Sequence, residues 1–242
     1  MSPLNAVMDA YDRRARFYPM VLVLLPLFLG IACWAPSGMQ LPGVLSGAAV
    51  TLAVAALLTQ LARDQGKRRE KELFRLWGGR PSDRALSYGG RALADATLAR
   101  CHKKLMAIDP DLQLPASREV EKEGGKEARS SFAAATELLI TRTRDKEKFP
   151  LLFKENVSYG FRRNLWGMKP AGILTSVLGA CACGGKIVAL GLPALSINTI
   201  SMVCGGICAL LGIIWCARIT PSWVRIPAEG YSKQLVEACE SL

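Results

Sequence analysis

The chain has 242 residues, 50% of them hydrophobic, and a formal net charge of +11. A mean hydropathy of +0.21 is high for a soluble protein, so the apolar and the basic residues must occupy separate blocks. This separation excludes an ordinary soluble nucleic-acid-binding domain and favours a membrane protein whose basic surface faces anionic lipid headgroups.

The apolar blocks predict two membrane hairpins. Residues 18–62 hold the first and second spans, and residues 170–217 hold the third and fourth, each close to the length that crosses a hydrocarbon core of about 30 Å. A cleaved signal peptide is the alternative for the first span, but Ala35-Pro36 is a poor cleavage site and a second span follows at once. Small residues recur along the spans, which favours close packing of the hairpins or a homo-oligomer.

Charged segments flank the hairpins. Residues 1–17 predict an amphipathic segment at the membrane surface, residues 63–169 a basic domain, and residues 218–242 a tail whose last part is helical or disordered. Thirty of the thirty-one Lys and Arg residues fall in these segments, and Lys186 is the exception. The positive-inside rule therefore places both termini and the central domain in the cytoplasm.

The central domain has twenty-four basic and fifteen acidic residues, a net formal charge of +9. It shows no alternating strand pattern, and we expect helices only, one of them beginning at Arg91 and another interrupted at Gly124-Gly125. The second span is expected to continue as a helix to Trp77 and to end at Gly78. The predicted fold is an all-α membrane protein with four transmembrane helices in two hairpins and a helical cytoplasmic domain between them.

A loop after Trp77 is the first candidate site, for an anion or a partner. Its glycines let backbone N–H groups converge, its arginines complement negative charge, and the helix expected near Arg91 adds its positive end. The spacing matches no P-loop or dinucleotide fingerprint, so glycines that end a helix beside solvated arginines are the competing interpretation. The candidate residues are Gly78, Gly79, Arg80, Arg84, Gly89, Gly90 and Arg91.

A second candidate set precedes the third span. It consists of Arg162, Arg163, Asn164, Trp166 and Lys169. The simpler interpretation is that these residues anchor the helix at the headgroup layer and supply a packing face. The alternative is a coupling element that transmits a cytoplasmic signal to the third span.

No pattern in the sequence predicts catalysis, a metal or a cofactor. His102 stands beside Cys101 without a carboxylate-rich motif, so neither a metal site nor a Cys–His nucleophile is expected. The eight cysteines lack zinc or redox spacing and predict no disulfide framework. Nearly uncharged spans argue against a proton-coupled transporter.

Three motifs carry a resemblance: Trp77-Gly78-Gly79-x-Pro81, the run Tyr159–Asn164, and Lys169-Pro170. With them the chain resembles a group of uncharacterised bacterial inner-membrane proteins that often travel with accessory or phage-defence genes. The resemblance covers about the central half of the chain. It implies a bacterial inner-membrane setting and a non-enzymatic role, and it supplies no catalytic residues.

The expected function is that of a non-enzymatic sensor, scaffold or effector. Its cytoplasmic helices would bind a protein partner, and its spans would respond by changing their packing or permeability. Two alternatives remain open: an oligomeric ion channel gated by the central domain, and a membrane-tethered nucleotide or nucleic-acid binder. Nucleic acid is the less favoured partner, because anionic lipid explains the same positive charge.

Overall fold

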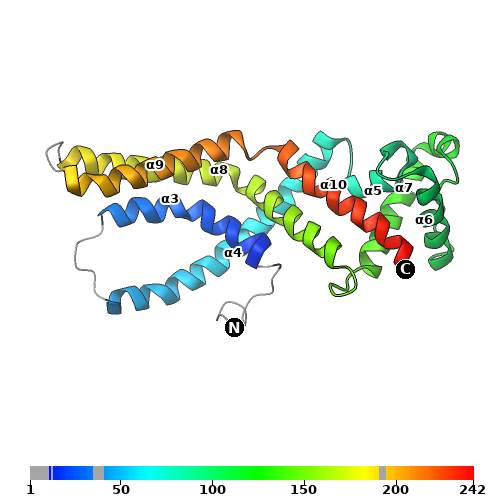
Figure 1. Ribbon diagram of the computed structural model, residues 1–242, viewed down its shortest axis with the longest axis horizontal. Helices are drawn as coiled ribbons and strands as arrows, with labels where there is room; N and C mark the ends of the chain where they lie inside the picture. Colours follow the sequence, from blue (N-terminus) through cyan, green and yellow to red (C-terminus); the bar gives the residue numbers. More distant parts are fainter. Residues whose placement is uncertain (1–10, 12, 35–40, 191–194) are drawn as a thin grey trace. The chain divides into compact units, whose positions relative to one another are not determined.

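The computed structural model describes Tyr11 and residues 13–34, 41–190 and 195–242, and every element in these residues is helical (Figure 1). The predicted all-α class is therefore confirmed. Most of the predicted amphipathic segment 1–17 lies outside the described residues, as do nearly all of the outer turn expected at residues 35–41 and Pro193 of the second outer turn. Ser196 and Asn198, which were also expected in the second turn, are instead helical, because the helix that follows begins at Leu195.

The chain divides into two compact units, each built from separate stretches of sequence. Unit 1 comprises Met1–Glu70 and Gly160–Trp223, and unit 2 comprises Lys71–Tyr159 and Val224–Leu242. Three helices contribute residues to both units: α4 (Leu41–Trp77), α8 (Pro150–Leu190) and α10 (Pro221–Glu237). The boundaries predicted at residues 17, 62, 169 and 217 refer to a membrane surface, and they stay predictions.

Unit 1 holds the apolar helices. Besides its parts of α4, α8 and α10 it contains the π-helix η1 (Arg13–Phe17), α3 (Tyr18–Trp34) and α9 (Leu195–Ala217). Among the described residues, three helices are long and apolar enough to cross a membrane: Arg13–Trp34, Pro150–Ala189 and Thr199–Ala217. They match the first, third and fourth predicted spans. Most side chains of the second predicted span, residues 42–62, lie outside the described part of the structure, so this span stays a prediction.

Helix α8 is the helix against which the others of unit 1 pack, because glycines along it expose its backbone. At Gly179 an added β-carbon would lie 2.3 Å from the carbonyl oxygen of Pro26 in α3. At Gly172 it would lie 2.2 Å from the indole ring of Trp215 in α9. Only glycine fits these contacts, and small residues of this kind are what allow membrane helices to approach closely.

Close contacts at glycines continue along α8 toward its charged end. At Gly167 an added β-carbon would lie 2.7 Å from the backbone nitrogen of Gly66 in α4. At Gly160 it would lie 2.8 Å from the hydroxyl oxygen of Tyr11. At the α4–α8 crossing one backbone therefore lies directly on the other, with no side chain between the two glycines.

Unit 2 combines the end of α4 and the start of α8 with most of α10. Its other elements are α5 (Pro81–Leu86), the 3-10 helix η2 (Tyr88–Gly90), α6 (Asp95–Ile108), α7 (Arg118–Arg142) and the 3-10 helix η3 (Ala238–Ser241). Helix α4 ends at Trp77 as predicted. The expected interruption of α7 is also present, since Gly125 has φ 49° and ψ −109° inside it.

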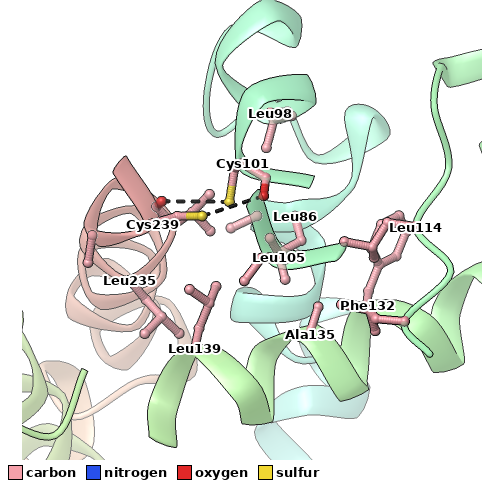
Figure 2. Close-up of a cluster of buried hydrophobic side chains, with 14 of the residues drawn as sticks. Leu86, Leu98, Cys101, Leu105, Leu114, Phe132, Ala135, Leu139, Leu235 and Cys239 are labelled. Atoms are coloured by element: carbon pink, nitrogen blue, oxygen red, sulfur yellow. Dashed lines mark hydrogen bonds between the residues drawn. The ribbon is translucent and has the colours of Figure 1, made fainter. Parts of the chain in front are cut away.

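The core of unit 2 gathers buried leucines from four helices. These leucines are Leu86, Leu98, Leu105, Leu139 and Leu235. Figure 2 shows them together with the thiols of Cys101 and Cys239. The Cys239 thiol donates to the carbonyl oxygen of Cys101 at 3.5 Å, which fixes η3 against α6. The last residues of the chain are therefore helical and packed, and the alternative of a disordered tail is wrong.

His102 belongs to this core. It is 2% exposed, and its Nδ1 and Nε2 lie 3.1 and 2.8 Å from the carbonyl oxygens of Pro115 and Leu86. Each ring nitrogen faces a backbone carbonyl, and the nitrogen that carries the proton donates to its carbonyl, so the imidazole contacts the segments on either side of α6.

Replacing Gly179 by Ala tests the contact between α3 and α8. We expect Gly179→Ala to lower the free energy of unfolding by about 1–3 kcal/mol, because the new methyl group meets a backbone carbonyl that no side-chain rotation can move. Thermal unfolding of the detergent-solubilised chain, followed by far-UV circular dichroism, measures this.

The matched control is Gly184→Ala, five residues further along α8, where an added β-carbon has no neighbour within 4 Å. There the higher helix propensity of alanine should leave stability unchanged or raise it by up to about 1 kcal/mol. Equal losses for the two variants would contradict the assignment of Gly179 to a helix contact.

Candidate anion-binding site

The first two residues of the predicted loop site end a helix. Gly78 and Gly79 have φ of 77° and 130°, a region that favours glycine. Gly79 donates its backbone N–H to the carbonyl of Phe74 at 2.8 Å, and Gly78 donates to the carbonyl of Arg75 at 3.2 Å. This is the Schellman pattern, which satisfies the last carbonyls of α4. For these two glycines the competing interpretation therefore holds: they end a helix.

Arg80 is engaged in an ion pair. It precedes α5, and Pro81 occupies a first-turn position, where a fixed φ favours the helix. The Nη1 of Arg80 donates to Oε1 of Glu137 on α7 at 2.6 Å. An exposed pair of this kind contributes little to stability, about 0–1 kcal/mol, but it occupies the guanidinium. Arg80 therefore joins α5 to α7.

The predicted helix start at Arg91 is wrong. The Glu121 carboxylate on α7 accepts hydrogen bonds from the Ser87 hydroxyl and, at 2.7 Å, from the backbone N–H of Tyr88. These bonds hold residues 88–90 in η2 rather than in an extended loop. Arg91 follows with φ 54°, and α6 begins only at Asp95. No positive helix end lies at Arg91.

A cavity of about 340 Å³ lies between α5, the residues that follow η2, and α10. Each of these segments supplies one basic side chain: Arg84, Arg91 and Lys233. The remaining lining residues are Pro81, Ala85, Gly90, Ala92, Glu229, Gly230 and Ser232. Of the predicted residues, Arg84, Gly90 and Arg91 therefore meet at one cavity, whereas Gly78, Gly79, Arg80 and Gly89 do not line it.

Small residues bring the three walls together. An added β-carbon at Gly90 would overlap the carbonyl oxygen of Arg84, so only glycine lets this turn lie on α5. At Gly230 it would lie 2.9 Å from Oε2 of Glu155, where α10 approaches the start of α8. The hydroxyl oxygens of Ser82 and Ser232 lie 3.2 Å apart and link α5 to α10.

The cavity is electrostatically positive. Arg84 donates from Nη1 to the carbonyl of Trp77 at 2.8 Å, and among the described residues neither Arg84 nor Arg91 has a carboxylate at ion-pair distance. The Nζ of Lys233 lies 3.8 Å from Glu237. The one acidic lining residue, Glu229, accepts from Arg225 at 2.6 Å. Two guanidinium groups are thus available to an anion.

The chemistry that this lining supports is binding. Guanidinium groups make charge-assisted, often bidentate hydrogen bonds to phosphate or carboxylate. The Ser232 hydroxyl donates to the carbonyl of Ala228 at 2.7 Å and is engaged within its own helix. Within the described part of the chain, no group of His, Cys, Asp and Glu could hold a metal ion.

The second predicted set lies in unit 1 and joins α8 to its neighbours. Arg163 donates to Glu70 of α4 at 2.9 Å, and their side chains are only 11% and 23% exposed. Asn164 is 1% exposed and donates from Nδ2 to the carbonyl of Ala15 in η1 at 2.7 Å. These contacts tie α8 to α4 and η1 at the level of the glycine crossing.

The rest of this set contacts the chain after α9. Lys169 donates from Nζ to the carbonyls of Cys216 and Ile219, at 3.0 and 2.8 Å, which places a cation on the negative end of α9. The guanidinium of Arg162 lies 4.7 Å from the ring centroid of Trp223 and donates to its carbonyl at 2.9 Å. Trp166 lies beside the Lys169 ammonium, at 5.7 Å from its ring centroid.

Sequence reasoning missed the third wall of the cavity, since the tail was given no part in a site. A signal was present in the sequence, where five residues recur at helical spacing, and all five are buried within unit 2: Ala228, Ser232, Leu235, Val236 and Cys239. A helix with one face buried presents its other residues at the surface. The pattern could have placed Lys233 on a packed helix, but not beside Arg84.

In the part of the chain that the structure describes, these observations define an all-helical protein with three helices long and apolar enough to cross a membrane and, in unit 2, a cavity with three basic lining residues. Comparison of the chain with protein-family models, with curated proteins and with solved structures finds no match in any of the three.

Asp83, next to Arg84 in α5, gives a prediction for pH. Burial raises the pKa of Asp83 above its ordinary value of 3.8, an effect that Thr136 and Arg80 partly oppose. The folded chain therefore holds this proton at pH values where the unfolded chain releases it, and stability falls as pH rises through that window. We expect Asp83→Asn to raise the free energy of unfolding at pH 7 by up to about 1 kcal/mol and to flatten its decline above about pH 4.

Urea unfolding of the detergent-solubilised chain at several pH values measures both effects. Asp111→Asn is the control, because the Asp111 side chain is exposed. A loss of stability in Asp83→Asn at pH 7 would show that the ionised carboxylate stabilises the fold.

Proposed function

We propose that the chain is a non-enzymatic integral membrane protein that acts as a sensor, scaffold or effector. Its helical unit 2 binds an anionic group of a ligand or protein partner, and unit 1 responds in the membrane. The observation that carries the proposal is the cavity lined by Arg84 and Arg91, neither of which has a carboxylate at ion-pair distance among the residues that the structure describes. Guanidinium groups in such a site are suited to recognising negative charge.

The membrane setting is supported by three helical stretches that are long and apolar enough to span: Arg13–Trp34, Pro150–Ala189 and Thr199–Ala217. Residues 42–62 complete the proposed set of four spans. The distribution of Lys and Arg supports a topology with both termini and unit 2 in the cytoplasm of a bacterial cell, and the protein in its inner membrane. Glycine and other small residues on the spans support a homo-oligomer.

Coupling between the units is proposed through α4 and α8, which are single helices with residues in both. The Arg163–Glu70 pair and the Gly167–Gly66 crossing join these two helices to each other. A shift of α8 along its axis would break the bonds from Asn164 and Lys169. Arg162, Arg163, Asn164 and Lys169 are the proposed coupling residues, with Trp166 packed beside them.

A membrane-tethered nucleotide binder is the second candidate. The same cavity favours it, because two guanidinium groups suit a phosphate.

Binding of inorganic pyrophosphate, ATP and a Glu-rich peptide to the full chain in nanodiscs tests both proposals. We expect at least one of these anions to bind with an affinity that falls as salt increases. The double variant Arg84→Gln/Arg91→Gln should weaken that binding at least about tenfold, since each charge-assisted hydrogen bond contributes about 1.5–3 kcal/mol. Isothermal titration calorimetry measures the affinities.

Arg129→Gln is the matched control, because Arg129 is an exposed arginine of α7 away from the cavity. The affinity of the Arg129→Gln variant for the anion should equal that of the parent chain. Binding of none of the three anions, or an equal loss in the control, would contradict the proposed site. Preference for the peptide would favour a protein partner, and preference for ATP would favour the nucleotide binder.

A further inference from the structure

A second hollow lies in unit 1, along the outside of α8 and α9. It is a groove of about 470 Å³, between Ile173 and Cys181 on α8 and between Cys208 and Ala217 on α9. Ser176 is the one hydroxyl in its lining, and it donates to the carbonyl of Gly172 at 2.7 Å. The groove therefore offers no free polar group, and it suits a hydrocarbon occupant.

The length of the groove corresponds to one lipid leaflet. Cys208 to Ala217 spans about 14 Å at 1.5 Å per residue. That is about half of a hydrocarbon core of 30 Å. The lining of the groove ends at Cys208 on α9 and at Cys181 on α8. A helix from a second copy would be expected to need a face along the whole span, whereas an acyl chain ends at the bilayer midplane.

Positive charge stands at the open end of the groove. Arg218 follows Ala217 directly, is exposed, and among the described residues has no carboxylate at ion-pair distance. Its guanidinium lies 5.7 Å from the ring centroid of Trp223. A tryptophan beside a basic residue at a helix end is typical of the headgroup layer. An anionic headgroup at this level would meet Arg218.

From the apolar lining, the length and the charge, we propose that the groove holds one acyl chain of an anionic phospholipid, with its phosphate at Arg218. This lipid site goes beyond the proposed function and does not depend on the cavity in unit 2. Hydrocarbon is as apolar as the groove, so affinity for the chain comes from van der Waals contact rather than from a hydrophobic driving force. Selectivity comes from the headgroup, at about fivefold per basic side chain.

Native mass spectrometry of the full chain tests the site. The protein is purified with equal amounts of phosphatidylglycerol and phosphatidylcholine of the same acyl chains, and the retained lipids are counted. We expect the parent to retain phosphatidylglycerol over phosphatidylcholine about fivefold. Ala209→Leu should lose the retained lipid of both kinds, because the larger side chain fills the groove. Arg218→Gln should keep a lipid but lose the preference for phosphatidylglycerol.

Ala171→Leu is the matched control, since Ala171 is an exposed alanine of α8 outside the groove. Ala217→Leu fills the groove at its charged end and replaces Ala209→Leu if that variant does not fold. Equal lipid retention by the filling variants and the control would overturn the proposal, as would an unchanged preference in Arg218→Gln. A parent dimer that the filling variants dissociate would overturn it in favour of a second copy.

Discussion

The packing of unit 1 depends on how closely other helices can approach the backbone of α8. In a bilayer the lipid tails are as apolar as the helix surfaces, so burial alone does not bring helices together, and the fit between them decides. Gly160, Gly167, Gly172 and Gly179 lie against η1, α4, α9 and α3 in turn. Helix α8 therefore contacts four neighbouring helices through its glycines. Asn164 and Lys169 add directional hydrogen bonds to backbone carbonyls at two of these contacts.

Unit 2 is held together by different physics. Its core consists of buried leucines with Phe132 and Tyr88, whose removal from water stabilises a fold in aqueous surroundings. The polar contacts lie at the edges of this core, where Glu121 fixes η2 and the Cys239 thiol fixes η3. The cavity exists because α10, which is distant in sequence, meets α5 and the residues after η2, and each of these three segments contributes a cation.

Local chemistry made part of the structure predictable. The end of α4 followed from Gly78 and Gly79, because a left-handed cap depends on residues next to each other in the chain. The break at Gly125 and three helices long and apolar enough to span a membrane were predictable for the same reason, from glycine and from the length of apolar runs. Helix α5 and the late start of α6 could not be predicted in this way, because Glu121, more than thirty residues away in the sequence, fixes the turn between the two helices. The site followed only in part, since Arg84 and Arg91 are near each other in sequence and Lys233 is not.

The crossing of Gly66 and Gly167 has a consequence for how the protein is made. About a hundred residues separate the two glycines, and at a synthesis rate of about 5–20 residues per second α8 leaves the ribosome roughly 5–20 s after α4. During that interval α3 and α4 are present without the backbone against which they pack. In the proposed membrane setting we expect these two helices to wait in the bilayer, with lipid or the insertion machinery covering Gly66 until α8 arrives. Assembly of unit 1 is therefore expected to follow translation, with α8 displacing these temporary neighbours.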